Sequence, residues 1–440
     1  MKGYVRTATL ASVFGLTALS SLGIATPAMA SGFALREQST EGLGDAFAGQ
    51  TAKAYNVNTA YYNPAGMTRL DGNEAASTVS WIQPEVKFTG TNTQPGSGTT
   101  SGGSGGNAIK PTAITSTFGV ISVNPDLKIG LSFAVPFGMR TEYKEDWVGR
   151  YQALATSMTD YEFSPTLAYK LTDKLSVGGG PRFDYLKGLM TSAIDFGSIG
   201  AGYGVPGYAP GNHDGQAKVE GSDAGFGYVL GALYEFDNQT RIGVNYRSRI
   251  HHDVDGKISF QSVPSFAANS PNLINQNNRF KVTLPDSLSG GLYHDINSQW
   301  SVMADASWTH WSLFKTLNVV GDNGASLNNT NENWHDTWFL SLGTHYKPSA
   351  DWTLRAGVAF DQTPVDTAYR TARIPDANRY WASVGAAYDL NDWSEINLGY
   401  THIFMDTVNI NETNAAPTGT LTGKYDSHID IVSVSYGLRF

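Results

Sequence analysis

The sequence has 440 residues, a formal net charge of −9 at pH 7, 48 glycines, 12% aromatic residues and no cysteine. The acidic balance argues against a nucleic-acid partner. The lack of cysteine excludes a disulfide framework, so a chain of this length must be held together by its own sheet.

Residues 1–30 predict a secretory signal peptide. Lys2 and Arg6 precede an apolar run that ends in the small-residue site Ala28-Met29-Ala30, and we expect cleavage after Ala30. The run is interrupted by Ser, Thr and Gly and is shorter than the roughly 20 residues that span a membrane as a helix. No later run is long and apolar enough either, so a membrane-inserted mature chain would have to be a β-barrel.

Residues 31–74 lack strand-like alternation and predict a small, partly helical N-terminal unit, which we call the hatch. A unit this short can hardly fold alone, so we expect it to pack inside or against the rest of the chain. Its apolar side chains would line or fill a barrel interior, although about half of them could form the hatch's own core. They are Phe33, Leu35, Leu43, Phe47, Tyr55, Tyr61, Tyr62 and Met67.

Residues 75–440 consist of alternating strands joined by two kinds of connection. Long Gly-, Asn-, Ser- and Pro-rich loops alternate with short polar turns, an asymmetry typical of transmembrane β-barrels. Six short turns give six hairpins, and the first and last strands complete a fourteen-stranded antiparallel barrel. The turns are 124–126, 172–173, 237–239, 297–298, 347–349 and 391–392.

The alternation also assigns the two faces of the barrel wall. In the last strand, residues 428–440, Val432, Val434 and Tyr436 share one face, and the strand ends on Phe440. If the apolar faces meet lipid, Arg355 and Arg379 point into the lumen. We expect the terminal strand with Phe440 to be recognised by the barrel-assembly machinery. Aromatic residues near strand ends, expected at the membrane interfaces, include Trp300, Trp352, Tyr388 and Trp393.

No residues form a recognisable active site, and we expect neither an enzyme nor a cofactor. The run 251–253 with Asp255 contains His and Asp, but in a strand His252 faces away from its neighbours, so we expect rim charges rather than a metal site. No G-x-S-x-G elbow marks a nucleophile, which counts against a barrel lipid hydrolase.

Residues 134–138 place Pro136 and Gly138 inside the third predicted strand. Proline removes a ladder hydrogen bond and glycine permits a kink, so this strand is bent or locally unpaired. Two interpretations remain open. The break could let an apolar solute leave sideways into the membrane, or it could be a bulge that only relieves curvature.

Several motifs resemble the FadL-type outer-membrane transporters of long-chain fatty acids and other hydrophobic compounds. The similarity covers essentially the whole mature chain. The motifs that carry it are Ser31-Gly32-Phe33, residues 42–46, Asn63-Pro64-Ala65, residues 284–287, residues 299–300, residues 308–312, residues 374–381 and Phe440.

The resemblance implies a fourteen-stranded barrel plugged by the hatch and diffusion-driven uptake of a hydrophobic ligand. It places the ligand pocket at the hatch N-terminus, Ser31 to Leu35 with Phe33, and a lateral exit at Pro136, Phe137 and Gly138. A plugged lumen is also unsuited to a general porin. The alternative within the same fold is a channel for aromatic or aliphatic hydrocarbons.

The basic residues that hold a carboxylate in the family are not found at the corresponding spacing, where Ser192 and Thr330 stand instead. By inward parity, the candidate replacements are Arg182, Arg355 and Arg379, each of which could instead pair with lumenal carboxylates such as Asp184. The expected surroundings are outer-membrane lipid and lipopolysaccharide, and a closed barrel with no sheet edge is expected to be monomeric.

Overall fold

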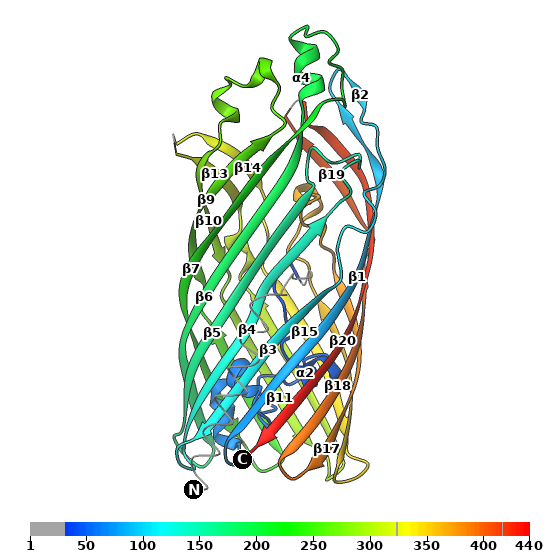
Figure 1. The fold of residues 1–440 in the computed structure, drawn as a ribbon. Helices are drawn as coiled ribbons and strands as arrows, with labels where there is room; N and C mark the ends of the chain where they lie inside the picture. The colour runs from blue at the N-terminus through cyan, green and yellow to red at the C-terminus, as the bar shows by residue number, and fades with distance from the viewer. Residues whose placement is uncertain (1–30, 323, 416) are drawn as a thin grey trace.

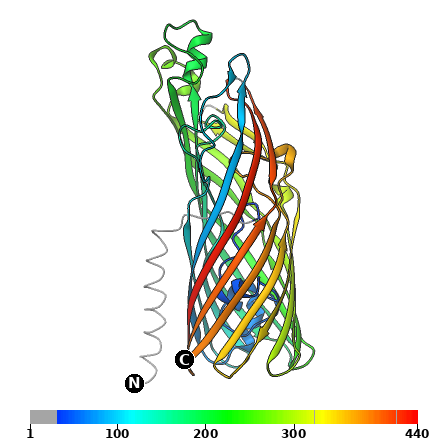
Figure 2. The same ribbon diagram turned by 90° about the vertical axis from the view of Figure 1, so that its right-hand side faces the viewer.

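The chain forms a closed antiparallel β-barrel in the computed structural model, which describes residues 31–322, 324–415 and 417–440 (Figures 1 and 2). The signal peptide predicted at residues 1–30 lies outside the described residues. The strands are β1 (Glu74–Gln94), β2 (Gly98–Thr99), β3 (Thr112–Ser122), β4 (Leu127–Glu142), β5 (Ala155–Lys170), β6 (Leu175–Asp195), β7 (Asp214–Glu235), β8 (Thr240–Arg247), β9 (Ile250–Gln261), β10 (Gln276–Leu284), β11 (Ser287–Asp295), β12 (Trp300–Thr309), β13 (Thr316–Gly321), β14 (Ser326–Asn331), β15 (Thr337–Tyr346), β16 (Trp352–Asp361), β17 (Arg379–Asn391), β18 (Ser394–Met405), β19 (Val408–Asn414) and β20 (Gly419–Arg439).

These strands make a fourteen-stranded wall, as predicted. β8 with β9 forms one span, because β7 pairs with both, and β10 with β11 forms another. β2, β13, β14 and β19 extend the loops at the long-loop end. The wall closes where β1 pairs with β20 over nearly the full length of both strands. The six predicted short turns join consecutive strands at the opposite end. Because they are short, they fix which residues of the two joined strands lie opposite each other.

The two faces of the wall follow the predicted alternation. Val432, Val434 and Tyr436 of β20 are exposed, whereas Arg355 on β16 and Arg379 on β17 are buried on the inner side. The outer face is therefore apolar, as a lipid-facing wall requires. Aromatic side chains are exposed on the wall near the short-turn end, namely Trp300, Trp352, Tyr388 and Trp393.

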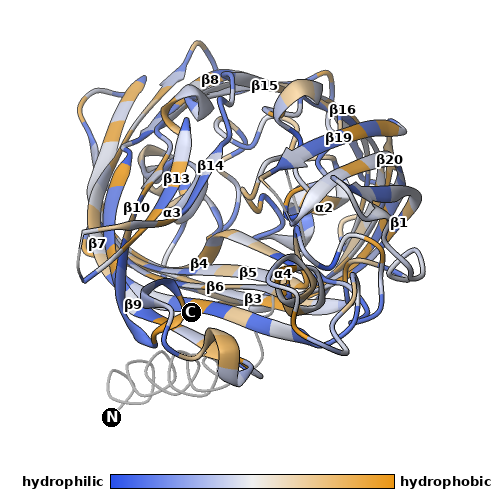
Figure 3. Ribbon diagram, turned by 90° about the horizontal axis from the view of Figure 1, so that it is seen from above, coloured by the Kyte–Doolittle hydropathy of each residue, from blue (hydrophilic) through white to orange (hydrophobic). Residues whose placement is uncertain are grey.

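The hatch lies inside the barrel, in the half nearer the short turns (Figures 1 and 3). It contains α2 (Thr40–Gly44), α3 (Thr59–Tyr62) and the 3-10 helix η1 (Pro64–Arg69). Ser39 caps α2 by accepting a hydrogen bond from Gly42 N. The remaining helices lie in the loops: α4 (Phe196–Gly202), η2 (Ser265–Ala267), η3 (Pro271–Leu273), η4 (Trp311–Leu313) and η5 (Thr367–Tyr369). Among the described residues, no helix has the length and hydropathy to cross a membrane.

Glycines in the wall let the hatch backbone approach closely. A Cβ at Gly357 would lie 2.1 Å from the carbonyl oxygen of Asp45, and one at Gly243 would lie 2.0 Å from that of Thr51. Inside the hatch, Lys53 Nζ lies 2.6 Å from Asp45 Oδ2, which also lies 2.8 Å from Nε2 of His345 in the wall. Burial opposes the charged form of Asp45, but Lys53 and His345 outweigh it and lower the pKa of this carboxyl. The hatch is thus fixed to the wall by shape and by charge.

Candidate functional site

The barrel wall is interrupted between β3 and β4, and we call this interruption the seam. The pairing of β4 with β5 shifts register between Ala134 and Phe137, so Val135 and Pro136 form a bulge. On β4, the pairing with β3 ends at Phe133, and the remaining residues of β3 pair with β1 alone. Among the described residues, the edge of β4 from Ala134 onward therefore has no strand partner on the β3 side. The position of residues 134–138 in a broken part of the third spanning strand agrees with the sequence prediction.

The N-terminus of the hatch fills the seam from the inside. Leu35 N donates to Pro136 O at 2.7 Å, and Gly138 N donates to Phe33 O at 2.7 Å, so residues 33–35 pair with the free edge of β4. The side chain of Gln38 adds two bonds to one residue, because its Nε2 donates to Val135 O at 2.7 Å and its Oε1 accepts from Val135 N at 3.1 Å. The seam is closed by hydrogen bonds to the hatch rather than by a strand.

The first hatch residues are held from the other side of the lumen. Ser31 Oγ donates to Gln362 O at 2.6 Å, and Gly32 N donates to Asp376 Oδ2 at 3.0 Å. Gly32 has a φ of +59°, and a Cβ there would lie 2.6 Å from the ring of Trp334, so this position needs glycine. The chain can therefore turn Phe33 toward the middle of the barrel.

Phe33 forms the floor of an apolar cavity with a volume of about 60 Å³. Its ring is buried and lies 4.6 Å from Trp311, 5.7 Å from Phe314 and 5.4 Å from Trp334, measured between ring centroids. Flexible methionines line the cavity as well, a residue type that adapts to apolar ligands of varied shape. The other apolar lining residues are Met139, Met158, Leu186, Leu189, Met190, Val219, Phe280, Val282, Leu317 and Ile374.

Two charged groups lie at this apolar cavity. Arg373, in the loop between β16 and β17, donates through Nη1 to Thr156 Oγ1 at 3.0 Å and to Thr191 O at 3.2 Å. Burial lowers the pKa of Arg373, but a guanidinium stays protonated. Glu332 accepts a hydrogen bond from Trp334 Nε1 at 3.1 Å, and burial raises its pKa to about 7. An apolar pocket with one guanidinium at its wall suits an amphiphilic anion.

The three arginines predicted to bind a carboxylate lie elsewhere in the lumen. Arg182 lies 2.7 Å from Glu162 and 3.4 Å from Asp184, which is the pairing that the sequence left open. Arg379 bonds to Asp376 and lies 3.5 Å from Asp361. None of them lines the apolar cavity.

Arg355 is likewise engaged by the protein, because its Nη1 donates to Asn397 Oδ1 at 2.8 Å. Side-chain parity predicted correctly that all three arginines face inward, since each is buried inside the barrel. Each guanidinium, however, already bonds to a side chain of the barrel and lies away from the apolar cavity, so we do not assign a ligand headgroup to them.

The Asn63-Pro64-Ala65 motif attaches the hatch to the barrel. Asn63 Oδ1 accepts from Ala65 N at 3.2 Å and so caps η1, while Pro64 starts the helix at the position where a missing N–H is harmless. Asn63 Nδ2 donates to Thr51 O at 2.7 Å and to Ala232 O of β7 at 3.0 Å. The motif thus serves docking of the hatch and does not line the apolar cavity.

The histidines of residues 251–253 separate as strand parity requires. His251 is exposed and His252 is buried, and their Nδ1 atoms meet Thr283 and Asp223 respectively. Within residues 31–322, 324–415 and 417–440, no group of three or more His, Asp or Glu side chains is arranged to hold a metal ion.

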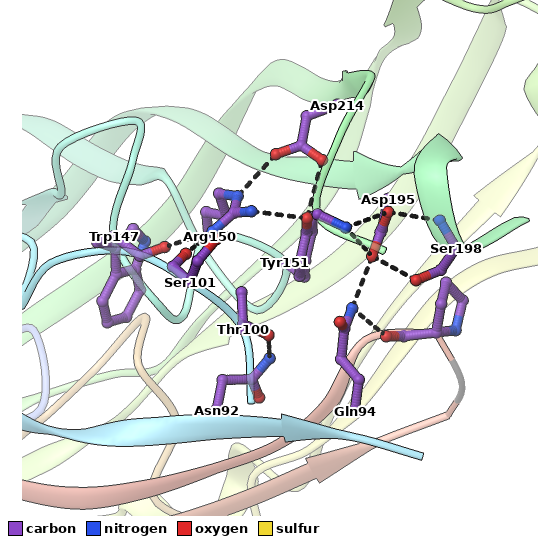
Figure 4. Close-up of polar contacts among 12 residues, drawn as sticks. Asn92, Gln94, Thr100, Ser101, Trp147, Arg150, Tyr151, Asp195, Ser198 and Asp214 are labelled. Carbon is purple, nitrogen blue, oxygen red and sulfur yellow. Dashed lines mark hydrogen bonds and ion pairs between the residues drawn. The ribbon is translucent and has the colours of Figure 1, made fainter. Parts of the chain in front are cut away.

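A polar network ties the loops at the long-loop end to the rim of the barrel (Figure 4). Arg150 Nε donates to Asp214 Oδ2 at 2.7 Å, and the Tyr151 hydroxyl donates to Asp214 Oδ1 at 2.8 Å. Gln94 at the end of β1 donates to Asp195 at the end of β6 at 2.8 Å. Because these carboxylates accept hydrogen bonds from protein donors, we assign the network a structural role: it connects β1, β6, β7 and the segment that precedes β5.

The sequence prediction missed two basic residues that the structure places at cavities. Arg373 stands just before the motif 374–381, in a loop where strand parity gives no direction. Arg36 belongs to the hatch and lines a second cavity in the centre of the lumen, described below. The only sequence signal for either was a basic residue next to a recognised motif.

Comparisons with known proteins agree with this architecture. A family model described as outer membrane protein transport protein (OMPP1/FadL/TodX) matches residues 21–440. Long-chain fatty acid transport proteins of Escherichia coli (strain K12) and Salmonella typhi are 29% and 30% identical to this chain, and each alignment covers 88% of this chain and 91% of the relative.

Among solved structures, a Pseudomonas aeruginosa FadL homologue has a TM-score of 0.84 at 26% identity, covering 93% of this chain and 100% of its own. The Pseudomonas putida toluene transporter TodX has a TM-score of 0.66 at 21% identity, covering 91% of this chain and 99% of its own, which shows a shared fold. The family match spans nearly the whole chain, and the barrel, the inner hatch and the terminal motifs agree with it. The chain belongs to the OMPP1/FadL/TodX family of outer membrane transport proteins.

Proposed function

We propose that this protein takes up long-chain fatty acids across the outer membrane by passive binding and lateral release. Transport of a hydrophobic substrate follows from the family. The fatty-acid assignment rests on one observation: the apolar cavity above Phe33 carries the guanidinium of Arg373 at its wall. The cavity would hold the acyl chain, and Arg373 would bind the carboxylate.

The proposed exit is the seam. An acyl chain in the apolar cavity contacts Phe33, whose carbonyl oxygen accepts the hydrogen bond from Gly138 N. Movement of the hatch N-terminus away from the bulge at Pro136 would leave the edge of β4 free toward β3. An apolar molecule could then pass between these strands into the membrane, without crossing the polar outer leaflet of lipopolysaccharide.

The second candidate is a channel for aromatic or aliphatic hydrocarbons. The observation in its favour is that Arg373 Nη1 is already bonded to Thr156 Oγ1 and Thr191 O, while most of the apolar cavity is lined by Met, Leu, Val and Phe. A solved relative of this fold is a toluene transporter. Indifference of uptake to the headgroup would favour this candidate.

The test is uptake of labelled oleate by cells that lack their own transporter and receive this protein intact or as a variant. Intact protein should restore uptake. Arg373→Gln should weaken oleate binding by about tenfold to a hundredfold, the loss expected for a hydrogen bond to a charged group. A matched control is Arg279→Gln, because Arg279 is exposed on β10 and, among the described residues, forms ion pairs with Asp253 and Asp255 alone.

Gly138→Arg, a bulky residue at the bulge, tests the route separately. If it inserts normally and abolishes uptake, the lateral exit is supported. If it transports like the intact protein, the substrate class stands and the exit lies elsewhere. If intact protein takes up toluene but no oleate, the fatty-acid assignment is wrong and the hydrocarbon channel replaces it.

A further inference from the structure

A second cavity lies in the centre of the lumen, between the hatch and the bulge of β4. Its volume is about 110 Å³, well above the roughly 10–15 Å³ that holds one water molecule. Leu35 and Phe47 of the hatch, Phe137 of β4 and Phe339 of β15 provide apolar walls. The apolar walls of this central cavity could contact a short stretch of acyl chain.

Three guanidinium groups line the central cavity, and two of them are already neutralised. Arg182 and Arg247 both bond to the buried carboxylate of Glu162, and Arg182 also donates to Ser248 O at 2.9 Å. These two arginines and Glu162 form a compact buried network. Their geometry is set by the protein, so they are not free to follow a ligand.

Arg36 is the third guanidinium and differs from the other two. It lies over the ring of Phe339, with 4.1 Å between its Cζ and the ring centroid. Among the residues that the structure describes, its side chain makes no hydrogen bond and no ion pair. A planar group with five N–H donors therefore stands at the cavity wall without an acceptor from the described part of the chain.

Two of the carboxylates that attract Arg36 are engaged by other donors. Asp305 accepts from Thr51 N at 3.0 Å and from the Thr51 hydroxyl. Asp361 lies 3.5 Å from Arg379. Both attract Arg36 through space, as does the neighbouring Glu37, but none forms an ion pair with it. These charges favour the charged guanidinium of Arg36 at the cavity without pairing with it.

We propose that Arg36 anchors a second carboxylate subsite, in the central cavity immediately inside the seam. This proposal rests on the fatty-acid function proposed above and adds a position to its path. The carboxylate of the substrate accepts hydrogen bonds from Arg36, and its first methylene groups lie against Leu35, Phe47 and Phe339. The subsite adjoins the closing contact, because Leu35, the residue before Arg36, donates to Pro136 O.

The test uses the purified full-length mature protein and 8-bromooctanoate, a carboxylate short enough to report on individual cavities. Crystals soaked with this probe locate its bromine by anomalous scattering, and calorimetry gives its affinity. We expect the carboxylate at Arg36 in the intact protein, and an affinity for this subsite lower by about tenfold or more in Arg36→Gln. Arg36→Lys, which keeps the charge, should retain the probe. Arg373→Gln, a change at the other cavity, should leave the Arg36 subsite occupied.

Several outcomes overturn the proposal: an empty central cavity in the intact protein, an unchanged probe in Arg36→Gln, or equal binding of 1-bromooctane in the same position. A common unfolding temperature of the variants excludes a folding defect, and Arg36→Lys supplies the comparison if Arg36→Gln does not fold. The two proposals fail differently. If cells do not take up oleate but the probe binds at Arg36, the proposed function is refuted and the anion subsite stands. If cells take up oleate but the central cavity stays empty, only the subsite is refuted.

Discussion

Replacing Gln38 with alanine should loosen the closure of the seam. Its side chain makes three buried hydrogen bonds, to Val135 O at 2.7 Å, to Val135 N at 3.1 Å and to Leu35 O at 3.2 Å. Only the two bonds to Val135 cross the seam. Each contributes about 0.5–1.5 kcal/mol net, so their loss should destabilise the closed seam by about 1–3 kcal/mol. At about 1.4 kcal/mol per factor of ten, the equilibrium constant for opening rises roughly 5- to 140-fold.

Hydrogen exchange measures this opening directly. The amides of Leu35 and Gly138 are bonded across the seam, to Pro136 O and Phe33 O, and should lose protection by the same factor in Gln38→Ala. Gln50→Ala is the matched control, because Gln50 is another hatch glutamine and its side-chain oxygen has no partner among the described residues. Unchanged protection in Gln38→Ala, or an equal loss in the control, would refute the reasoning. Lost protection without faster oleate uptake would mean that seam opening does not limit transport.

Three further predictions concern the hatch and the apolar cavity. Lys53→Ala leaves Asp45 buried without its cation and should lower the free energy of unfolding by about 3–5 kcal/mol, measured by denaturant titration in detergent. Gly243→Val should prevent docking of the hatch, since a Cβ would lie 2.0 Å from Thr51 O, and protease should then cleave the hatch of folded barrels. Burial raises the pKa of Glu332 from 4.5 to about 7, so its contribution to stability is complete below pH 4.5 and is lost as pH rises through 7. Oleate affinity should fall over the same pH range, because ionised Glu332 competes with the oleate carboxylate for Arg373. Glu332→Gln should flatten the pH profiles of both stability and affinity.

The barrel could be predicted from the sequence because its signals are local. Alternation with a period of two assigns each strand's faces, and short polar turns such as 237–239 fix the hairpins and hence the number of strands. Pro136 within a strand marked the bulge for the same reason. What local patterns could not show is that β3 stops pairing with β4 there, or that residues 33–35 supply the missing partner.

The candidate site was harder to predict, because strand parity shows whether a side chain points inward but shows neither its position along the barrel axis nor the groups that it contacts. Arg182, Arg355 and Arg379 do face inward, yet each bonds to another side chain of the barrel: Arg182 to Glu162 of β5, Arg355 to Asn397 of β18, and Arg379 to Asp376 in the loop before β17. Arg373 and Arg36 lie outside the regular strands, so no alternation describes them. Their importance depends on which cavity each one reaches, which is a property of the assembled barrel.

Phe33 links ligand binding to closure of the seam. Its ring forms the floor of the apolar cavity, while its carbonyl oxygen accepts the hydrogen bond from Gly138 N that helps close the wall. A ligand that pushes the whole residue aside also moves this backbone and weakens the bond from Gly138 N, whereas a ligand that leaves Phe33 in place does not act on the seam through it. Because a ligand shifts an equilibrium only by its difference in affinity for the two states, acyl chains that reach Phe33 should open the seam and shorter ones that bind only near Arg373 should not.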